Sequence, residues 1–394
     1  VDMFPNEVEF DFEAIKILNF DIETSCDDGF PNVETANERV IAITCELGDG
    51  HYTVFGCGDY TPTKNVTYVK CFGEKELLTK FIKYVKDSDP DILTGWNITQ
   101  FDIPYIIHRV ERLFDKKKAR SLSPWYRMKQ RHMILHGREY VAYDFVGIAT
   151  LDYLEVYKKF ALGNRESYKL DHIATVELNE GKLDYSKFGN LVTLYQTNYQ
   201  GFIEYNIKDV ELVRRIEDKL KLIEMIITTA YDAKVNYEDV FRQVRLWDNI
   251  IFNYFVQNKM VISQKQSHSK NEQYEGAYVK SPLLGMHDWV MSFDLTSLYP
   301  HLIAQFNISP DTIVGKDYEV TVDDLLEESI NLDALVETNT TLAANGCRFD
   351  ISKEGFLPHI LMKMFQDRKR YKSEMIKAKK ELERVNTELK RRET

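Results

Sequence analysis

The chain has 394 residues, which is too long for one small hydrophobic core, so two or three domains are expected. Hydrophobic residues make up 44% of the sequence, but no apolar run approaches the roughly 18 residues of a transmembrane helix, so a soluble globular protein with no membrane partner is predicted. The formal net charge of −11 argues against a protein that coats nucleic acid indiscriminately.

The N-terminal residues and the cysteines indicate a reducing, intracellular environment. Residues 1–6 contain neither a basic segment nor an apolar one, so a secretory signal is not supported and the cytoplasm is the expected location. The five cysteines are odd in number and contain no Cys-x-x-Cys pair, which argues against a disulfide framework and against a zinc ribbon.

Residues 17–23 alternate apolar and polar side chains, which is typical of a β-strand with one buried face. Asp21 and Glu23 are two positions apart, so both carboxylates project from the same face. Residues 40–47 and 51–55 are rich in β-forming side chains, and the Gly-Asp-Gly segment between them is typical of a hairpin turn. A three-stranded antiparallel meander is therefore predicted.

Helical and strand patterns alternate in the next part of the chain. Residues 74–86 place apolar side chains three or four positions apart, residues 91–94 form a short apolar run, and a helix is expected to begin at Asp102. The helical spacing returns across residues 199–222. These patterns predict a mixed α/β domain.

The C-terminal part has a different pattern. A segment bounded by glycine and proline at residues 276–282 indicates a domain boundary, residues 289–294 are expected to form a strand, and the last 30 residues a helix. Residues 363–394 hold twelve basic and six acidic residues, and residues 115–139 interleave basic side chains with two aromatic ones. Either basic segment is a solvated face or a surface for phosphates.

Four acidic residues and one tyrosine form the first candidate site. Phosphodiester hydrolysis needs a strong nucleophile and a neutralised leaving oxygen, which two Mg²⁺ ions about 3.5 to 4 Å apart supply together, and Mg²⁺ prefers carboxylate oxygens. Taken singly, these acids also suit a solvated strand edge or a helix N-cap. A tyrosine one helical turn from a metal ligand can orient the attacking water. Together they predict a two-metal site for Mg²⁺, with Mn²⁺ as a substitute. Its candidate ligands are Asp21, Glu23, Asp102 and Asp209, and Tyr205 is the candidate for orienting water.

Three motifs around these residues resemble those of the family B DNA polymerases, most closely the replicative polymerases of large tailed bacteriophages. Residues 20–23 (FDIE) resemble the first exonuclease motif, residues 97–102 (NITQFD) the second and residues 205–209 (YNIKD) the third. The resemblance implies a ribonuclease H-like 3′–5′ exonuclease domain in which the four carboxylates hold two metal ions and the tyrosine positions water. It also implies DNA contacts by Asn97 and Phe101.

Two further segments match DNA-contacting parts of this family. Residues 132–143 match the place of a β-hairpin that helps to separate the primer terminus from the template, and Arg138 within it would contact DNA. Residues 275–279 (EGAYV) resemble the segment between exonuclease and palm that contacts the template, through Gly276 and Tyr278.

Residues 292–300 (SFDLTSLYP) resemble the family's first polymerase palm motif. By this resemblance, Asp294 would be one of two palm metal ligands, and Tyr299 would exclude a ribose 2′-hydroxyl. The incoming dNTP would also lie near Leu295, Ser297 and Leu298. The alternative is a turn at a strand end that is followed by a core tyrosine.

Residues 365–372 (FQDRKRYK) resemble the first helix of the polymerase fingers. By this resemblance, Arg368 and Lys372, which are one turn apart, would face the triphosphate of the dNTP. An anion between them is consistent with their charge, because two neighbouring cations repel each other. A basic solvated helix is the alternative.

The resemblance divides the chain into five parts. These would be a remnant of an N-terminal domain (1–15), the exonuclease domain (16–221), a helical segment of the N-terminal domain (222–265), a partial α+β palm (266–354) and the start of the helical fingers (355–394). No Asp-Thr-Asp sequence follows Asp294, and the second fingers helix and the thumb are not found, so polymerisation by this chain alone is not expected. We expect either a trimmed polypeptide or one half of a split polymerase. A partner chain, or the absent C-terminal region that would contact a sliding clamp, would supply the rest.

The predicted function is proofreading, which is the hydrolysis of 3′-terminal nucleotides on primer–template or single-stranded DNA. A non-catalytic DNA-binding assembly subunit of a split polymerase is the alternative from another class. The presence of all four carboxylates favours the enzyme. A free-standing RNA-processing exonuclease is disfavoured by the palm and fingers motifs.

Overall fold

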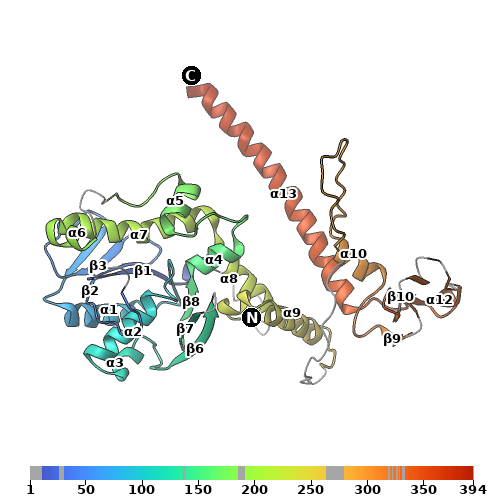
Figure 1. Cartoon of the computed structure of the whole chain (residues 1–394), viewed down its shortest axis with the longest axis horizontal. Helices are drawn as coiled ribbons and strands as arrows, with labels where there is room; N and C mark the ends of the chain where they lie inside the picture. The colour runs from blue at the N-terminus through green and yellow to red at the C-terminus, as the bar shows by residue number, and fades with distance from the viewer. Residues whose placement is uncertain are drawn as a thin grey trace. The chain divides into compact units, whose positions relative to one another are not determined.

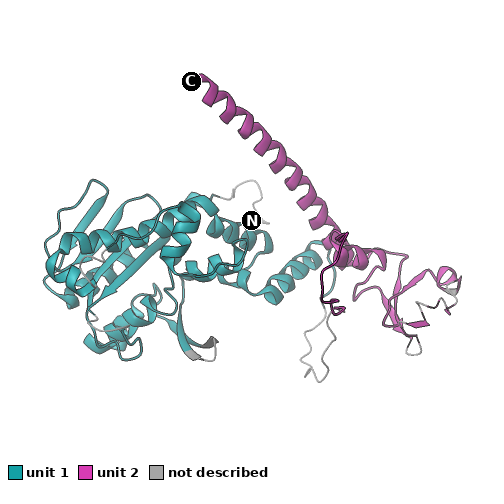
Figure 2. Ribbon diagram, turned by 45° about the horizontal axis from the view of Figure 1, so that its top comes forward, with its two compact units in different colours: residues 1–269 teal, residues 270–394 magenta. Residues whose placement is uncertain are grey.

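The computed structural model describes residues 11–25, 31–135, 138–184, 191–262, 279–317, 320–321, 323–324, 327, 329–330 and 333–393. The chain forms two compact units, residues 1–269 and 270–394 (Figure 2). Within these described ranges, no helix combines the length and the apolar character that a membrane crossing requires.

The first unit is built on a mixed six-stranded sheet with the strand order β4-β3-β2-β1-β5-β8. The strands are β1 (Ile17–Thr24), β2 (Val40–Glu46), β3 (Tyr52–Gly56), β4 (Val66–Lys70), β5 (Ile92–Gly95) and β8 (Ala149–Asp152). Strand β2 is antiparallel to both β1 and β3, so the predicted meander is confirmed. The remaining pairs, β1 with β5, β3 with β4 and β5 with β8, are parallel.

Helices cover both faces of this sheet (Figure 1). On one face, α1 (Glu74–Ser88) and α2 (Asp102–Leu113) pack against Phe20 and Ile22 of β1 in one hydrophobic core. On the other face, α7 (Tyr199–Leu220) crosses β1, β2 and β3. Since side chains alternate along a strand, the buried packing of Phe20 and Ile22 turns Asp21 and Glu23 toward α7.

The helix predicted over residues 199–222 ends earlier than expected. Lys221 adopts a left-handed backbone conformation with φ 55°, and a separate helix, α8 (Leu222–Ala233), begins directly after it. The Glu217 carboxylate accepts hydrogen bonds from the backbone N–H groups of Leu222, Ile223 and Glu224. These bonds satisfy the free donors at the start of α8 and stabilise the break.

The predicted hairpin is confirmed in its two strands. Strands β6 (Met128–Leu135) and β7 (Arg138–Phe145) are antiparallel and pair Leu135 with Arg138 across the end of the hairpin. Residues 136–137, between these two strands, lie outside the described residues. The first unit also contains the helices α3 (Lys116–Arg120), α4 (Tyr153–Phe160), α5 (Leu170–Leu178), α6 (Leu191–Thr197) and α9 (Gln243–Gln257) and the short 3-10 helices η1 (Phe12–Ala14) and η3 (Tyr237–Phe241).

The second unit contains a small sheet and a long helix. Strands β9 (Ile313–Lys316), β11 (Cys347–Asp350) and β10 (Thr340–Leu342) form an antiparallel sheet in the order β10-β11-β9. The short helix α10 (Leu298–Gln305) packs against the start of α13 (Phe356–Glu393), where the rings of His301 and Phe365 are 4.8 Å apart. A short helix α12 (Asp333–Glu337) precedes β10. Helix α13 confirms the helix predicted over the last 30 residues.

The strand predicted at residues 289–294 is wrong. These residues form no strand, and Trp289 and Phe293 are 97% and 86% exposed. An extended segment becomes a strand only when its backbone groups pair with a neighbour, and no described strand pairs with this one. An apolar pattern alone is therefore not sufficient here.

Candidate active site

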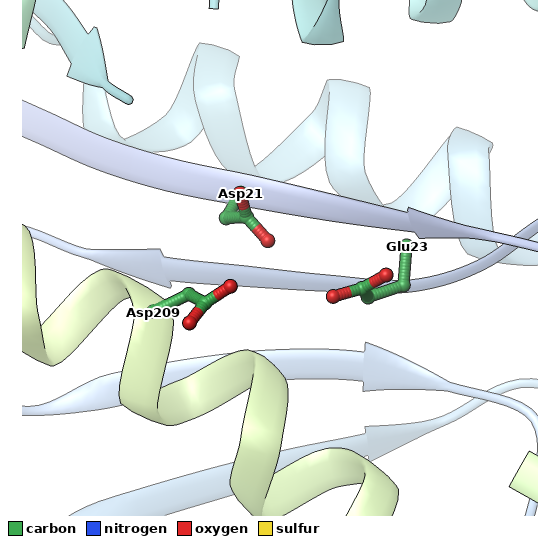
Figure 3. Close-up of side chains that lie close together, drawn as sticks. All are labelled: Asp21, Glu23 and Asp209. Carbon is green, nitrogen blue, oxygen red and sulfur yellow. The ribbon is translucent and has the colours of Figure 1, made fainter. Parts of the chain in front are cut away.

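Three carboxylates from two elements converge in the first unit (Figure 3). Asp21 and Glu23 project from β1, and Asp209 projects from α7 toward them. One ligand atom from each of the three lies within 4.8 Å of the other two, so the group could hold a metal ion. The structure therefore brings together three of the four acids that the sequence predicts as ligands.

The fourth acid, Asp102, lies beside this group. It opens α2, is 2% exposed, and its Oδ1 accepts a hydrogen bond of 3.0 Å from the backbone N–H of Ile22 on β1. Asp102 is not among the three acids whose ligand atoms lie within 4.8 Å, and its role as a ligand stays a prediction. The negative charge of Asp102 nevertheless repels that of Asp21 and helps to raise the pKa of Asp21.

Burial and mutual repulsion favour the protonated forms of these acids. Burial raises the pKa of Asp21 well above its usual value, and the charges of Asp102, Glu23 and Asp209 raise it further. Burial, followed by the charge of Asp209, raises the pKa of Glu23 to about 8. Burial raises the pKa of Asp102 to about 7. A divalent cation would reverse this tendency, because a nearby positive charge favours the ionised carboxylate.

A lysine that the sequence analysis missed, Lys182, supplies a positive charge to the site. Its Nζ lies 2.5 Å from Asp209 Oδ2 and 3.2 Å from the Tyr205 hydroxyl oxygen, and 5.2 Å from the centre of the Tyr205 ring. Burial by itself would lower the pKa of Lys182, but the charge of Asp209 raises it overall. The lysine is therefore protonated beside the carboxylates.

The local chain fixes the position of Lys182. Its backbone N–H donates to Asp171 Oδ1 at 2.8 Å, and a Cβ at the preceding Gly181 would lie 2.7 Å from the same oxygen. Glycine thus permits the close approach. The contact with Asp209 joins residues 27 positions apart, and no local periodicity could have predicted it.

Replacing Lys182 by methionine is expected to destabilise the metal-free protein by about 2 kcal/mol at pH 7. The Lys182 and Asp209 side chains are 27% and 6% exposed, so the loss should lie between the ~1 kcal/mol of an exposed pair and the roughly 3 to 5 kcal/mol of a buried one. Urea unfolding in the presence of a metal chelator measures this loss in the free energy of unfolding. Lys83→Met, which breaks an exposed pair with Asp87, is the control and should lose much less. Equal losses in the two variants would contradict a partly buried ion pair.

The segment that leads into α2 is held by Asp152. The Asp152 carboxylate accepts hydrogen bonds of 3.0 Å from the Asn97 N–H and 2.9 Å from the Thr99 N–H. Asn97 has a left-handed backbone with φ 67°, a conformation that asparagine tolerates better than most residues. Phe101 packs on Tyr105, with ring centres 5.5 Å apart. The DNA contacts predicted for Asn97 and Phe101 stay predictions.

The predicted palm and fingers residues lie in the second unit. Asp294 and Tyr299 are exposed, and Ser297 caps α10 with a left-handed backbone. Among the described side chains of this unit, no group of three metal-ligating residues includes Asp294. Arg368 and Lys372 are exposed on α13. Leu295 and Leu298 are exposed as well, at 69% and 41%.

Three predicted DNA-contacting residues cannot be placed. Gly276 and Tyr278 lie outside the described residues, and so does the side chain of Arg138, whose backbone belongs to β7.

Comparison with known proteins identifies the family. Residues 2–173 match the exonuclease domain of DNA polymerase family B, and residues 241–391 match DNA polymerase family B. The chain is 36% identical to the DNA-directed DNA polymerase of Escherichia phage RB69, over 96% of this chain and 44% of that protein. It is 33% identical to the DNA-directed DNA polymerase of Enterobacteria phage T4, over 95% of this chain and 44% of that protein.

A eukaryotic relative is more distant. The DNA polymerase delta catalytic subunit of Schizosaccharomyces pombe is 26% identical over 92% of this chain and 34% of that protein. The chain spans less than half the length of each of these curated relatives. The two matched regions and the two phage relatives, which agree with the motifs around the acidic site, show that the chain belongs to the family B DNA polymerases.

Proposed function

We propose that this chain hydrolyses the 3′-terminal nucleotides of DNA, as the proofreading exonuclease of a replicative family B polymerase. The observation that carries the proposal is the convergence of Asp21, Glu23 and Asp209 within 4.8 Å, in the unit that contains the match to the exonuclease domain. The proposal includes a ribonuclease H-like fold for residues 16–221. The mixed sheet with helices on both faces is consistent with this fold.

The donor set suits magnesium. All three converging groups are carboxylates, which are the hard oxygen ligands that Mg²⁺ and Mn²⁺ prefer. Asp209 Oδ1 is buried and has no hydrogen-bond partner among the described residues, as expected of an oxygen that a cation would bind. Asp21, Glu23, Asp209 and, in this proposal, Asp102 would hold two ions. When bound, the ions would activate water and neutralise charge on the leaving 3′ oxygen.

The residues around the carboxylates have their own tasks in this mechanism. Tyr205 lies one helical turn before Asp209, and its hydroxyl can hold the attacking water in line with the phosphate. Lys182 already contacts both residues, and its ammonium group can stabilise the negative charge that builds up on the phosphate oxygens. Asn97 and Phe101 are proposed to hold the terminal nucleotide.

The other parts of the chain are proposed to belong to the polymerase module. Residues 222–265 would be part of the N-terminal domain, 266–354 of the palm and 355–394 of the fingers. The division between compact units, at residues 269 and 270, supports a palm boundary near residue 266. Asp294 would bind metal, while Tyr299, Arg368 and Lys372 would contact a dNTP. Nucleotide transfer would need at least one palm carboxylate in addition to Asp294, because two ions require more than one acid.

The non-catalytic assembly subunit is not favoured. A scaffold has no need for three carboxylates that face one another in a partly buried site, since their repulsion destabilises the fold. A second polypeptide, a sliding clamp and a location in the host cytoplasm remain proposals.

A single assay tests the proposed activity. The chain is incubated with single-stranded DNA labelled at its 5′ end, with Mg²⁺ or with a chelator. We expect a ladder of products shortened from the 3′ end that appears only with the metal. A 3′-phosphorothioate end on the same DNA is the matched substrate control and should slow the first cut. Intact DNA after prolonged incubation with Mg²⁺ would overturn the proposal.

A further inference from the structure

A buried asparagine, Asn206, connects one carboxylate of the site to a neighbouring strand. It lies on α7 and is fully buried. Its Nδ2 donates to Asp21 Oδ2 at 2.7 Å, and its Oδ1 accepts from Thr44 Oγ1 at 2.5 Å. Thr44 is the residue of β2 that pairs with Asp21 in the antiparallel register, and it is also fully buried. The two bonds thus connect β2, α7 and β1.

The donor and acceptor roles in this connection have one consistent assignment when Asp21 is ionised. A carboxylate only accepts hydrogen bonds, so the Asn206 amide must turn its NH₂ group toward Asp21. Its oxygen then faces Thr44, and the Thr44 hydroxyl must donate. A flipped amide would place two acceptor oxygens against each other. The charged Asp21 therefore selects the amide orientation, and the Thr44 hydroxyl, which can donate or accept, fixes it by donating to the amide oxygen.

The same bonds restrict the Asp21 carboxylate. Its Oδ2 is held by Asn206, whereas its Oδ1 has no hydrogen-bond donor among the described residues. A carboxylate that is held on one oxygen cannot rotate freely about its last bond, so the other oxygen keeps a fixed direction. We propose that Asn206, anchored by Thr44, is a positioning residue that holds Asp21 ready to bind metal. This inference rests on the proposed metal-dependent exonuclease.

The chain offers a matched control for this role. Asn19 is also buried, at 4% exposure, and its Nδ2 donates to the Val210 carbonyl oxygen at 2.9 Å. It joins the same strand, β1, to the same helix, α7, but its amide bonds no carboxylate among the described residues. Asn19→Ala therefore measures what a buried amide between these two elements contributes to packing alone.

The experiment measures Mn²⁺ binding directly, by electron paramagnetic resonance, in the full chain without DNA. Asn206→Ala is expected to raise the dissociation constant for Mn²⁺ by about 10- to 100-fold, the usual effect of removing a group that orients a metal ligand. Thr44→Val should raise it by a smaller factor, while Thr44→Ser keeps the hydroxyl and should bind as the unchanged chain does. The double variant should bind no more weakly than Asn206→Ala, because Thr44 acts through Asn206. Asn19→Ala should lower the unfolding temperature and leave Mn²⁺ binding unchanged.

Several outcomes would overturn the inference. Asn206→Ala could bind Mn²⁺ as tightly as the unchanged chain, or Asn19→Ala could weaken binding as much as Asn206→Ala does, which would assign the effect to packing. Equal weakening by Thr44→Val and Thr44→Ser would show that the Thr44 hydroxyl does not contribute, and both variants keep the Asn206 amide that donates to Asp21. If the unchanged chain binds no Mn²⁺, the proposed metal site is contradicted, and the positioning role of Asn206 is contradicted together with it. This outcome is distinct from one in which only the Asn206 variant binds normally.

Discussion

The double variant Asp21→Ala/Glu23→Ala is expected to shorten a 5′-labelled single-stranded DNA more than about 100-fold more slowly than the unchanged chain. Removing a group that only orients a metal ligand already lowers metal affinity or activity by about 10- to 100-fold. Here two of the three converging carboxylates are lost, and Asp209 with the neighbouring Asp102 is too small a ligand set for two ions. Initial rates on denaturing gels measure the effect.

Two controls separate lost chemistry from lost folding. Glu46→Gln changes a buried acid of the adjacent strand β2, whose carboxylate accepts a hydrogen bond from the Gly50 N–H, and it should keep the rate. The double variant itself should unfold at the same or a higher temperature than the unchanged chain at pH 8 without metal, because it removes carboxylates that repel each other. A double variant that still degrades DNA at the full rate would place the chemistry elsewhere.

The second large effect concerns pH and metal together. Without metal, the free energy of unfolding should fall as pH rises from about 4.5 to 8, relative to the variant Glu23→Gln. Burial raises the pKa of Glu23 to about 8 in the folded chain, whereas its ordinary pKa is 4.5. Between these two pH values, the folded chain keeps a proton on Glu23 that the unfolded chain has released. Stability from this group is therefore complete below pH 4.5 and is lost as pH approaches 8. Each retained proton contributes a slope of about 1.4 kcal/mol per pH unit.

Magnesium should reverse this loss. A divalent cation binds the ionised carboxylates, so Mg²⁺ should raise the unfolding temperature more at pH 8 than at pH 5.5. Thermal unfolding across this pH range, with Mg²⁺ or a chelator, measures both effects. The Glu23→Gln variant lacks the titrating group and should show a weaker dependence on pH. Identical pH slopes in the two proteins would show that Glu23 ionises normally in the fold.

Local patterns predicted much of the first unit. The alternation in residues 17–23 predicted a strand that turns Asp21 and Glu23 to one face, and the structure confirms both the strand and the convergence with Asp209. The prediction succeeds because Phe20 and Ile22 are buried on one face of β1, so the alternating residues Asp21 and Glu23 must lie on the other face.

Other features depend on contacts that no local pattern contains. Lys182 meets Asp209 through a loop whose path is set by Asp171, and Asn206 meets Thr44 across 162 positions. The helix predicted over residues 199–222 already ends at Leu220, because Lys221 is left-handed and the Glu217 carboxylate stabilises the start of the next helix. In the second unit, residues 289–294 have the pattern of a strand but no described pairing partner.

The long helix α13 affects how the stability of this chain is measured. Its 38 residues correspond to about 57 Å of helix, and every described side chain from residue 368 to residue 392 is exposed. A helix without tertiary contacts frays gradually and does not share the cooperative transition of a packed core. Far-ultraviolet circular dichroism will therefore superimpose a sloping, noncooperative signal from α13 on the unfolding of the sheet. In a variant that keeps only Trp96 of the four tryptophans, fluorescence would report the cooperative transition separately, because the Trp96 ring lies against those of Tyr153 and Tyr157 in the first unit.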